Sequence, residues 1–170
     1  MHVRVENDFI IIAGRRVDIA SVNRVFLVAA GKAASSMALE TEKIVGSHID
    51  AGIVVTKYHH ALPLRICKTI EAGHPVPDEN SIAGGKAVVE IFKDSTPDDL
   101  IIMLVSGGAS ALLADWPPGC TLEDVQLTVQ ALLNCGAAID EVNTIRKHLS
   151  LIKGGQLMHY TAATVIALLI

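Results

Sequence analysis

The 170-residue sequence is poor in charge and in aromatic side chains, since only 19% of its residues are charged and 4% are aromatic. Its 14 basic and 18 acidic residues give a net charge of −4, without the basic excess of a nucleic-acid-binding protein. Hydrophobic residues make up 51% of the chain, which excludes general disorder. The unbroken apolar runs are far shorter than the roughly 20 residues of a membrane-spanning helix. We therefore expect a globular domain that binds neither nucleic acid nor membrane.

Cysteine is also scarce. The three cysteines, Cys67, Cys120 and Cys135, are odd in number, far apart and without CxxC spacing. This pattern argues against a disulfide framework or a zinc site and favours a reducing compartment. The polar N-terminal residues lack the basic-then-apolar pattern of a signal peptide. We expect a cytoplasmic protein.

Three common catalytic and nucleotide-binding motifs are missing. The segment around Gly31-Lys32 is not a Walker A loop, because Phe26 replaces its first glycine and Ala33 its Ser/Thr. No GxGxxG follows a predicted strand, which argues against a dinucleotide site. Ser106 lacks the GxSxG context of a serine nucleophile.

Apolar runs alternate with amphipathic segments along the chain. Strands are predicted at Phe9–Ile12 and Val17–Ile19 (a hairpin), Val25–Ala30, Ala51–Thr56, Thr69–Ala72, Leu100–Val105 and Thr164–Ile170. Helices are predicted at Ala33–Val45, from Asp78 to about Phe92, from Thr121 to Gly136, and through Ile139–Ile152. The strands after residue 25 lack polar alternation and should be buried on both faces. This order predicts an α/β fold, a Rossmann-like α/β/α layering with a mainly parallel sheet.

Glycine turns follow two of these strands, at the sheet edge where ligands gather in parallel α/β proteins. Gly31 and Lys32 open a predicted helix, whose free amide hydrogens and adjacent cation would suit a phosphate or carboxylate. This signal alone is weak, because a Gly-Lys pair after a strand is often only a turn with a solvated lysine.

The second turn, Ser106-Gly107-Gly108-Ala109-Ser110, follows the most convincing buried strand. Adjacent glycines let backbone amides approach an anion closely, and the two serines add hydroxyl donors. We predict an anion-binding loop here rather than a plain turn.

Polar side chains also gather on the last predicted helix. Asn143, Arg146 and Lys147 are three to four residues apart and would share one face. Such a face is usually just solvated, but its density of donors also suits an anion. Lys153-Gly154-Gly155 follows, either as a helix break or as another anion-binding turn.

Two other polar segments favour structural roles. The histidines at 59, 60 and 74 have no carboxylate or cysteine at a recognisable ligand spacing, so we expect surface or hydrogen-bonded histidines. The acidic start at Asp78-Glu79 could meet a magnesium ion, yet it is ordinary helix capping. We predict no metal site.

Six segments in order along the chain resemble the glycerate 2-kinase family, whose C-terminal part is called the MOFRL domain. They are Gly31–Ala34 with Met37-Ala38, Val54–Tyr58, Glu71–Ser81, Ser106–Leu113, Asn143–Ser150 and Lys153–Gly155. The resemblance implies ATP- and Mg²⁺-dependent phosphorylation of D-glycerate to 2-phosphoglycerate, in a cleft between two domains. Phosphoryl transfer depends mainly on positioning and charge neutralisation, which suits these residues.

The resemblance also implies roles for individual residues. Lys32 would be the catalytic cation that steadies the transferring phosphoryl group. The cofactor-binding residues would be Gly31, Ser106, Gly107, Gly108 and Ser110. The substrate-binding residues would be Asn143, Arg146 and Lys147.

The sequence departs from the family at several points. His59 replaces a usual glycine and Gln156 a usual arginine. Family members have a further N-terminal helical segment and a second domain, with another catalytic arginine and the acidic residues expected to hold magnesium. We therefore expect residues 1–170 to be a truncated N-terminal α/β domain, inactive alone. The high apolar fraction, with the segment Thr164–Ile170 that resembles an interior strand, predicts association, such as a homo-oligomer, or poor solubility.

Two alternatives remain open at this point. A hydroxypyruvate reductase, a name this family has carried, would bind NADH. A noncatalytic assembly module would self-associate without binding nucleotide.

Overall fold

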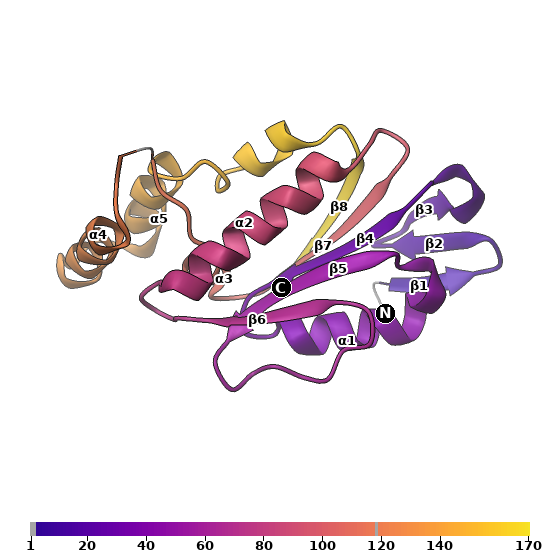
Figure 1. Cartoon of the computed structure of the whole chain (residues 1–170), viewed down its shortest axis with the longest axis horizontal. Helices are drawn as coiled ribbons and strands as arrows, with labels where there is room; N and C mark the ends of the chain where they lie inside the picture. The colour runs from indigo at the N-terminus through magenta and orange to yellow at the C-terminus, as the bar shows by residue number, and fades with distance from the viewer. Residues whose placement is uncertain (1–2, 118) are drawn as a thin grey trace.

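The chain forms two β-sheets in the computed structural model, which describes residues 3–117 and 119–170 (Figure 1). The larger sheet has five parallel strands in the order β6-β5-β4-β7-β8. Its strands are β4 (Val25–Ala30), β5 (Ala51–Lys57), β6 (Lys68–Ala72), β7 (Leu100–Val105) and β8 (Thr164–Leu169). The smaller, antiparallel sheet has the order β1-β2-β3, with β1 (Val3–Glu6), β2 (Phe9–Ile12) and β3 (Arg15–Asp18). The predicted α/β class with a mainly parallel sheet is confirmed.

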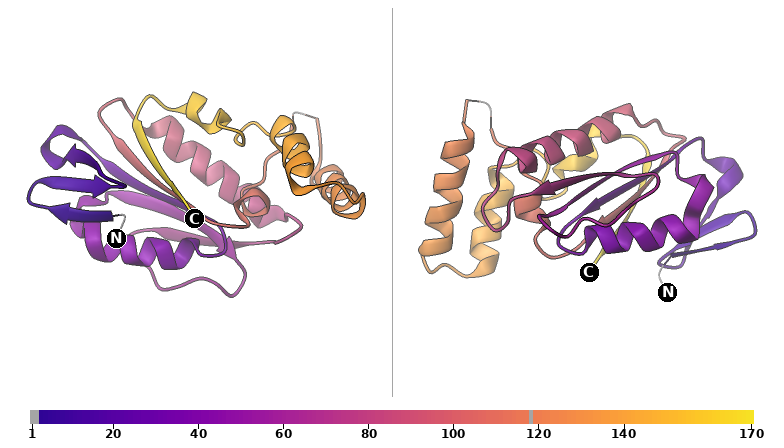
Figure 2. Two further views of the ribbon diagram at one scale, coloured as in Figure 1. Left: turned by 180° about the vertical axis from the view of Figure 1, so that it is seen from behind. Right: turned by 60° about the horizontal axis from the view of Figure 1, so that its bottom comes forward.

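Helices cover both faces of the large sheet (Figures 1 and 2). On one face α1 (Ala34–Val45) packs on Leu27 and Ala29 of β4, and apolar side chains of β1 and β2 join this cluster. On the other face α2 (Glu79–Asp94) packs on Phe26 and Val28, with the short helix η3 (Gln156–Tyr160) beside it. Successive side chains of β4 thus pack into the hydrophobic clusters on opposite faces of the sheet, which is why the sequence of this strand is apolar without alternation.

The strand order reverses between β4 and β7. From β4 the chain passes through α1 to β5 on one side, whereas from β7 it proceeds to β8 on the other. The first turn after β4 enters α1 on one face, and α3 (Ala109–Leu112), which follows β7, contacts α2 on the opposite face. Loops that part in this way leave a crevice at the carboxyl ends of the two strands. The fold therefore brings the two predicted glycine turns together.

Two further helices, α4 (Leu122–Asn134) and α5 (Ile139–His148), extend from the end of the molecule opposite the antiparallel sheet (Figure 2). The predicted cap of α4 is confirmed, since the Thr121 hydroxyl accepts a hydrogen bond from the Asp124 amide. The prediction that α5 continues through residue 152 is wrong. The Ser150 hydroxyl accepts the amides of Ile152 and Lys153 and so turns the chain away from the helix axis.

Two other elements differ from expectation. Strand β1 was not predicted, and it extends the expected hairpin into a meander. Strand β8 forms as predicted but is not buried on both faces. Among the described residues it pairs with β7 alone, at the sheet edge. Its Ile166 is buried, whereas Leu169 is 75% exposed. Within the described residues, every helix is too short or too polar to cross a bilayer.

An ion pair joins the amino ends of the two central strands. Arg24, just before β4, donates from Nη2 to Oδ2 of Asp99 at 2.8 Å, and the Asp99 side chain is fully buried. Asp99 also accepts the backbone amide and hydroxyl of Thr96. The hydrogen bonds from Arg24, with those from Thr96, outweigh burial and lower the pKa of Asp99 from 3.8 to about 2.

Because the folded-state pKa of Asp99 is depressed, its stabilisation is complete above about pH 4 and is lost as pH falls toward 2. We expect Asp99→Asn to lower the free energy of unfolding at pH 7 by about 1–3 kcal/mol. Urea denaturation from pH 7 to pH 2 should show this difference shrinking below pH 4. The exposed Asp98→Asn variant is the matched control, and a difference independent of pH would contradict the assignment.

Candidate anion-binding site

The loops after β4 and β7 approach each other more closely than any side chain would allow at Gly31. This glycine has a φ of +129°, and a Cβ built on it would lie 2.1 Å from Oγ of Ser106 and 2.5 Å from its carbonyl oxygen. Thr56, in β5, donates its hydroxyl to the Gly31 carbonyl at 3.0 Å. The carboxyl ends of the neighbouring strands β4, β5 and β7 are therefore held together at Gly31.

The amides at the start of α1 complete this fastening. Gly31 donates to the Val55 carbonyl at 3.1 Å, Lys32 to the Gly107 carbonyl at 3.0 Å, and Ala33 to Oγ of Ser106 at 3.0 Å. The expectation of free amide hydrogens in this turn is wrong for these three residues. A ligand contact by Gly31 itself stays a prediction, whereas the Lys32 side chain is exposed beside the turn.

The amides that are available lie in the second glycine turn. Within residues 3–117 and 119–170, the backbone amides of Gly107, Gly108 and Ser110 donate to no protein acceptor. Gly108 has a left-handed backbone (φ +94°) and precedes α3. Ser106 is buried and its hydroxyl already accepts the Ala33 amide, so its part is to hold the loop in place. The 107–110 segment is therefore where this loop can bind an anion.

Positive charge collects around this turn. A Cβ on Gly108 would lie 3.1 Å from Nε2 of His74 and 3.3 Å from Cγ of Lys32, so both side chains flank the glycine. Burial lowers the pKa of His74, and the positive charges of Lys32, Lys57 and Arg146 lower it further. These four side chains come from the ends of β4, β5 and β6 and from α5. An anion bound here would relieve their mutual repulsion.

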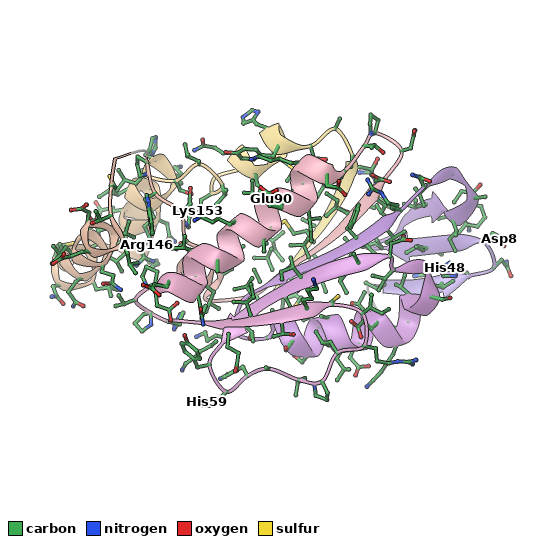
Figure 3. All side chains as sticks on the ribbon, in the orientation of Figure 1. Asp8, His48, His59, Glu90, Arg146 and Lys153 are labelled. Atoms are coloured by element: carbon green, nitrogen blue, oxygen red, sulfur yellow. The ribbon has the colours of Figure 1, made fainter. Side chains whose placement is uncertain are left out.

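Arg146 lies on α5, and Figure 3 shows it at the same end of the molecule as Lys153. Its Nε is buried without a hydrogen-bond partner among the described residues, and burial lowers the pKa of its guanidinium. A buried donor left unpaired is costly, so a ligand acceptor at this position would be favourable.

A cavity of about 530 Å³ lies between α5 and the carboxyl ends of β7 and β8. Its polar lining consists of Ser110, Asn143, Arg146, Lys147 and Lys153, with Gly154 and Gly155 at one wall. The structure thus brings the predicted substrate-binding residues together with one end of the glycine turn. Lys32 and His74, which both flank Gly108, do not line this cavity.

Lys153 is the one cation of the cavity with a carboxylate partner recorded. Its Nζ lies 3.1 Å from Oδ1 of Asp115, which also accepts the Ser150 hydroxyl. Burial lowers the pKa of Lys153 and the nearby Arg146 adds to this, whereas Asp115 opposes it. Asp115 therefore orients the segment after α5 and offsets part of its positive charge.

Sequence reasoning missed His74 and Lys57 as members of the site. His74 was expected to be a surface or hydrogen-bonded histidine because it has no metal-ligand spacing. The available signal was its position directly after a predicted strand, since parallel strands end at the same edge as the two glycine turns. Lys57 carried the same signal at the end of β5.

In the part of the chain that the structure describes, no three His, Cys, Asp or Glu side chains gather as metal ligands. The chemistry offered by Lys32, Lys57, Arg146 and the free amides is hydrogen-bond donation to anions.

The chain is similar to known proteins over nearly its whole length. A family model described as "Domain of unknown function (DUF4147)" matches residues 2–170. A glycerate 2-kinase from Pyrococcus horikoshii is 43% identical over 168 residues, which are 99% of this chain and 37% of that protein.

Solved structures show the same similarity. A crystal structure of a protein from Pyrococcus horikoshii matches with a TM-score of 0.89 and 42% identity, over 99% of this chain and 38% of the other. A glycerate kinase from Thermotoga maritima matches with a TM-score of 0.80 and 43% identity, over 89% and 37%. The chain therefore spans somewhat over a third of the length of these relatives.

The close approach at Gly31 leads to a stability test. We expect Gly31→Ala to lower the free energy of unfolding by about 2–5 kcal/mol, because overpacking against Ser106 adds to backbone strain. Gly14→Ala is the matched control, since Gly14 also has a positive φ (+85°) but no neighbour within 4 Å of its Cβ position. It should cost only about 1 kcal/mol. If urea denaturation shows the same loss of unfolding free energy for Gly31→Ala and Gly14→Ala, Ser106 moves aside and the prediction is wrong.

Proposed function

Because this chain belongs to the DUF4147 domain family, we propose that it forms the anion-binding half of a glycerate kinase active site. The observation that carries the proposal is the convergence of Lys32, Lys57, Arg146 and His74 on a glycine turn with free amides. Both reactants of a glycerate kinase, a carboxylate and a nucleoside triphosphate, are anions. A site made of cations and backbone donors suits them.

Each part of the site has a role in this proposal. Phosphoryl transfer needs reactants held in line and developing negative charge neutralised. Lys32, mobile and beside the free amides, steadies the transferring phosphoryl group. The amides of Gly107, Gly108 and Ser110 hold phosphate oxygens of ATP.

The substrate binds from the side of α5 in this proposal. Arg146 offers its unpaired guanidinium to the glycerate carboxylate. Asn143 and Lys147 line the same cavity and contribute further hydrogen bonds. The cavity volume, about 530 Å³, is ample for a three-carbon acid.

Mg²⁺ accompanies ATP in kinases, but the described residues do not fit it. The ion prefers oxygen ligands, usually one or two carboxylates, and the charged groups around Gly108 are cations. We therefore assign residues of this chain to the anions of the reaction and none to the metal.

The first test is direct binding to the 170-residue chain by titration calorimetry. We expect Arg146→Ala to weaken D-glycerate binding roughly tenfold, because a charge-assisted hydrogen bond is worth about 1.5–3 kcal/mol. Lys32→Ala should weaken ATP by a similar factor. Lys43→Ala is the matched control, since Lys43 pairs with Glu40 on an exposed helix face. Unchanged affinities in both site variants would contradict the proposal.

The second test is turnover. We expect the 170-residue chain, supplied with MgATP and D-glycerate, to bind anions without forming ADP, because it spans only somewhat over a third of the length of the glycerate kinases it matches. If the chain forms ADP and Lys32→Ala abolishes this activity, the chain contains a working active site rather than half of one. Fluorescence titration with NADH provides the contrast, and tight binding would favour a hydroxypyruvate reductase instead.

A further inference from the structure

His74 differs chemically from the cations and amides of this site. Lys32, Lys57, Arg146 and the amides of the glycine turn only donate hydrogen bonds. His74 is half-buried, and its Nε2 edge faces Gly108. A neutral imidazole carries one nitrogen that accepts a hydrogen bond and takes up a proton.

The surroundings of His74 favour its neutral form. Burial disfavours the charged ring, and the charged groups that act on it most strongly, Lys32 after β4, Lys57 of β5 and Arg146 of α5, are all cations. Its pKa is therefore lowered from the ordinary 6.5, and the ring is neutral near pH 7.

A hydroxyacid needs such an acceptor. Its carboxylate suits the cations, but its hydroxyl must lose a proton when it attacks phosphorus. Ser110 and Asn143 have oxygen atoms that accept hydrogen bonds, yet neither oxygen takes up an additional proton near neutral pH. Lys153, whose pKa burial also lowers, is engaged by Asp115 at 3.1 Å.

We propose that Nε2 of His74 binds the reacting hydroxyl of a 2-hydroxyacid and accepts its proton during phosphoryl transfer, an inference that rests on the proposed function. In this step the O–H bond breaks and its proton passes to Nε2. The oxygen electron pair forms the new bond to the γ-phosphorus of a nucleoside triphosphate. The bond from that phosphorus to its bridging oxygen breaks, and the diphosphate leaves with the electron pair.

The first experiment measures hydroxyl recognition in the 170-residue chain. D-Glycerate and 3-hydroxypropionate share a carboxylate, but the second lacks the 2-hydroxyl. We expect the unaltered chain to bind D-glycerate about 3–10-fold more tightly, as one hydrogen bond allows. His74→Ala should remove this preference while 3-hydroxypropionate still binds.

Two variants sharpen this result. His74→Gln places an amide acceptor near the Nε2 position and should restore much of the preference. His48→Asn is the matched control, because His48 lies at the opposite end of the molecule from Arg146 (Figure 3). A preference that persists in His74→Ala would overturn the proposal.

The second experiment locates the proton by ¹⁵N NMR of the histidine rings, with the His74 signals assigned by the His74→Gln variant. In the D-glycerate complex near pH 7, we expect Nε2 of His74 to be unprotonated and Nδ1 to carry the hydrogen. D-Glycerate should also raise the pKa of His74, since its negative charge offsets the cations. A protonated Nε2 in the complex would overturn the inference.

The outcomes separate this inference from the function beneath it. If neither D-glycerate nor inorganic phosphate binds the chain, the proposed function fails. If both bind but the hydroxyl preference and ring signals do not depend on His74, only the assignment of His74 fails.

Discussion

The contact between Gly31 and Ser106 is the constraint on which the rest of the site depends. With no side chain at Gly31, the loop after β4 lies directly on the loop after β7. The hydrogen bonds from Lys32 and Ala33 then join the two loops. Because this contact lies where the strand order reverses, it fixes the base of the crevice between elements that leave to opposite faces.

This fastening also decides which backbone groups remain for a ligand. The backbone amides of the turn at Gly31 donate hydrogen bonds to the neighbouring strand and loop, so this turn has a structural role. Among the described residues, the amides of Gly107, Gly108 and Ser110 donate to no protein acceptor. The positively charged side chains of the site come from separate segments that the parallel sheet brings to the same edge. The site is thus assembled by topology rather than by one contiguous motif.

The sequence predicted the elements better than the site. An apolar run such as Leu100–Val105 predicts a strand covered on both faces, and a glycine turn marks its end. The length of α5 was unpredictable because its end depends on hydrogen bonds of Ser150 with Asp115, 35 residues away in sequence. His74 was missed for a similar reason. Its neighbours Gly108 and Arg146 are remote in sequence, so no local pattern reports its surroundings.

The cluster of like charges has an energetic consequence. Lys32, Lys57 and Arg146 repel one another, and among the described residues no salt bridge engages these three. A folded chain tolerates this repulsion when a rigid scaffold, here the joined ends of β4, β5 and β7, supplies enough stability elsewhere. The charge of a bound anion cancels this repulsion, which adds to its binding free energy. Burial and the same positive charges lower the pKa of His74, which in our proposal links recognition of the carboxylate to proton transfer from the hydroxyl.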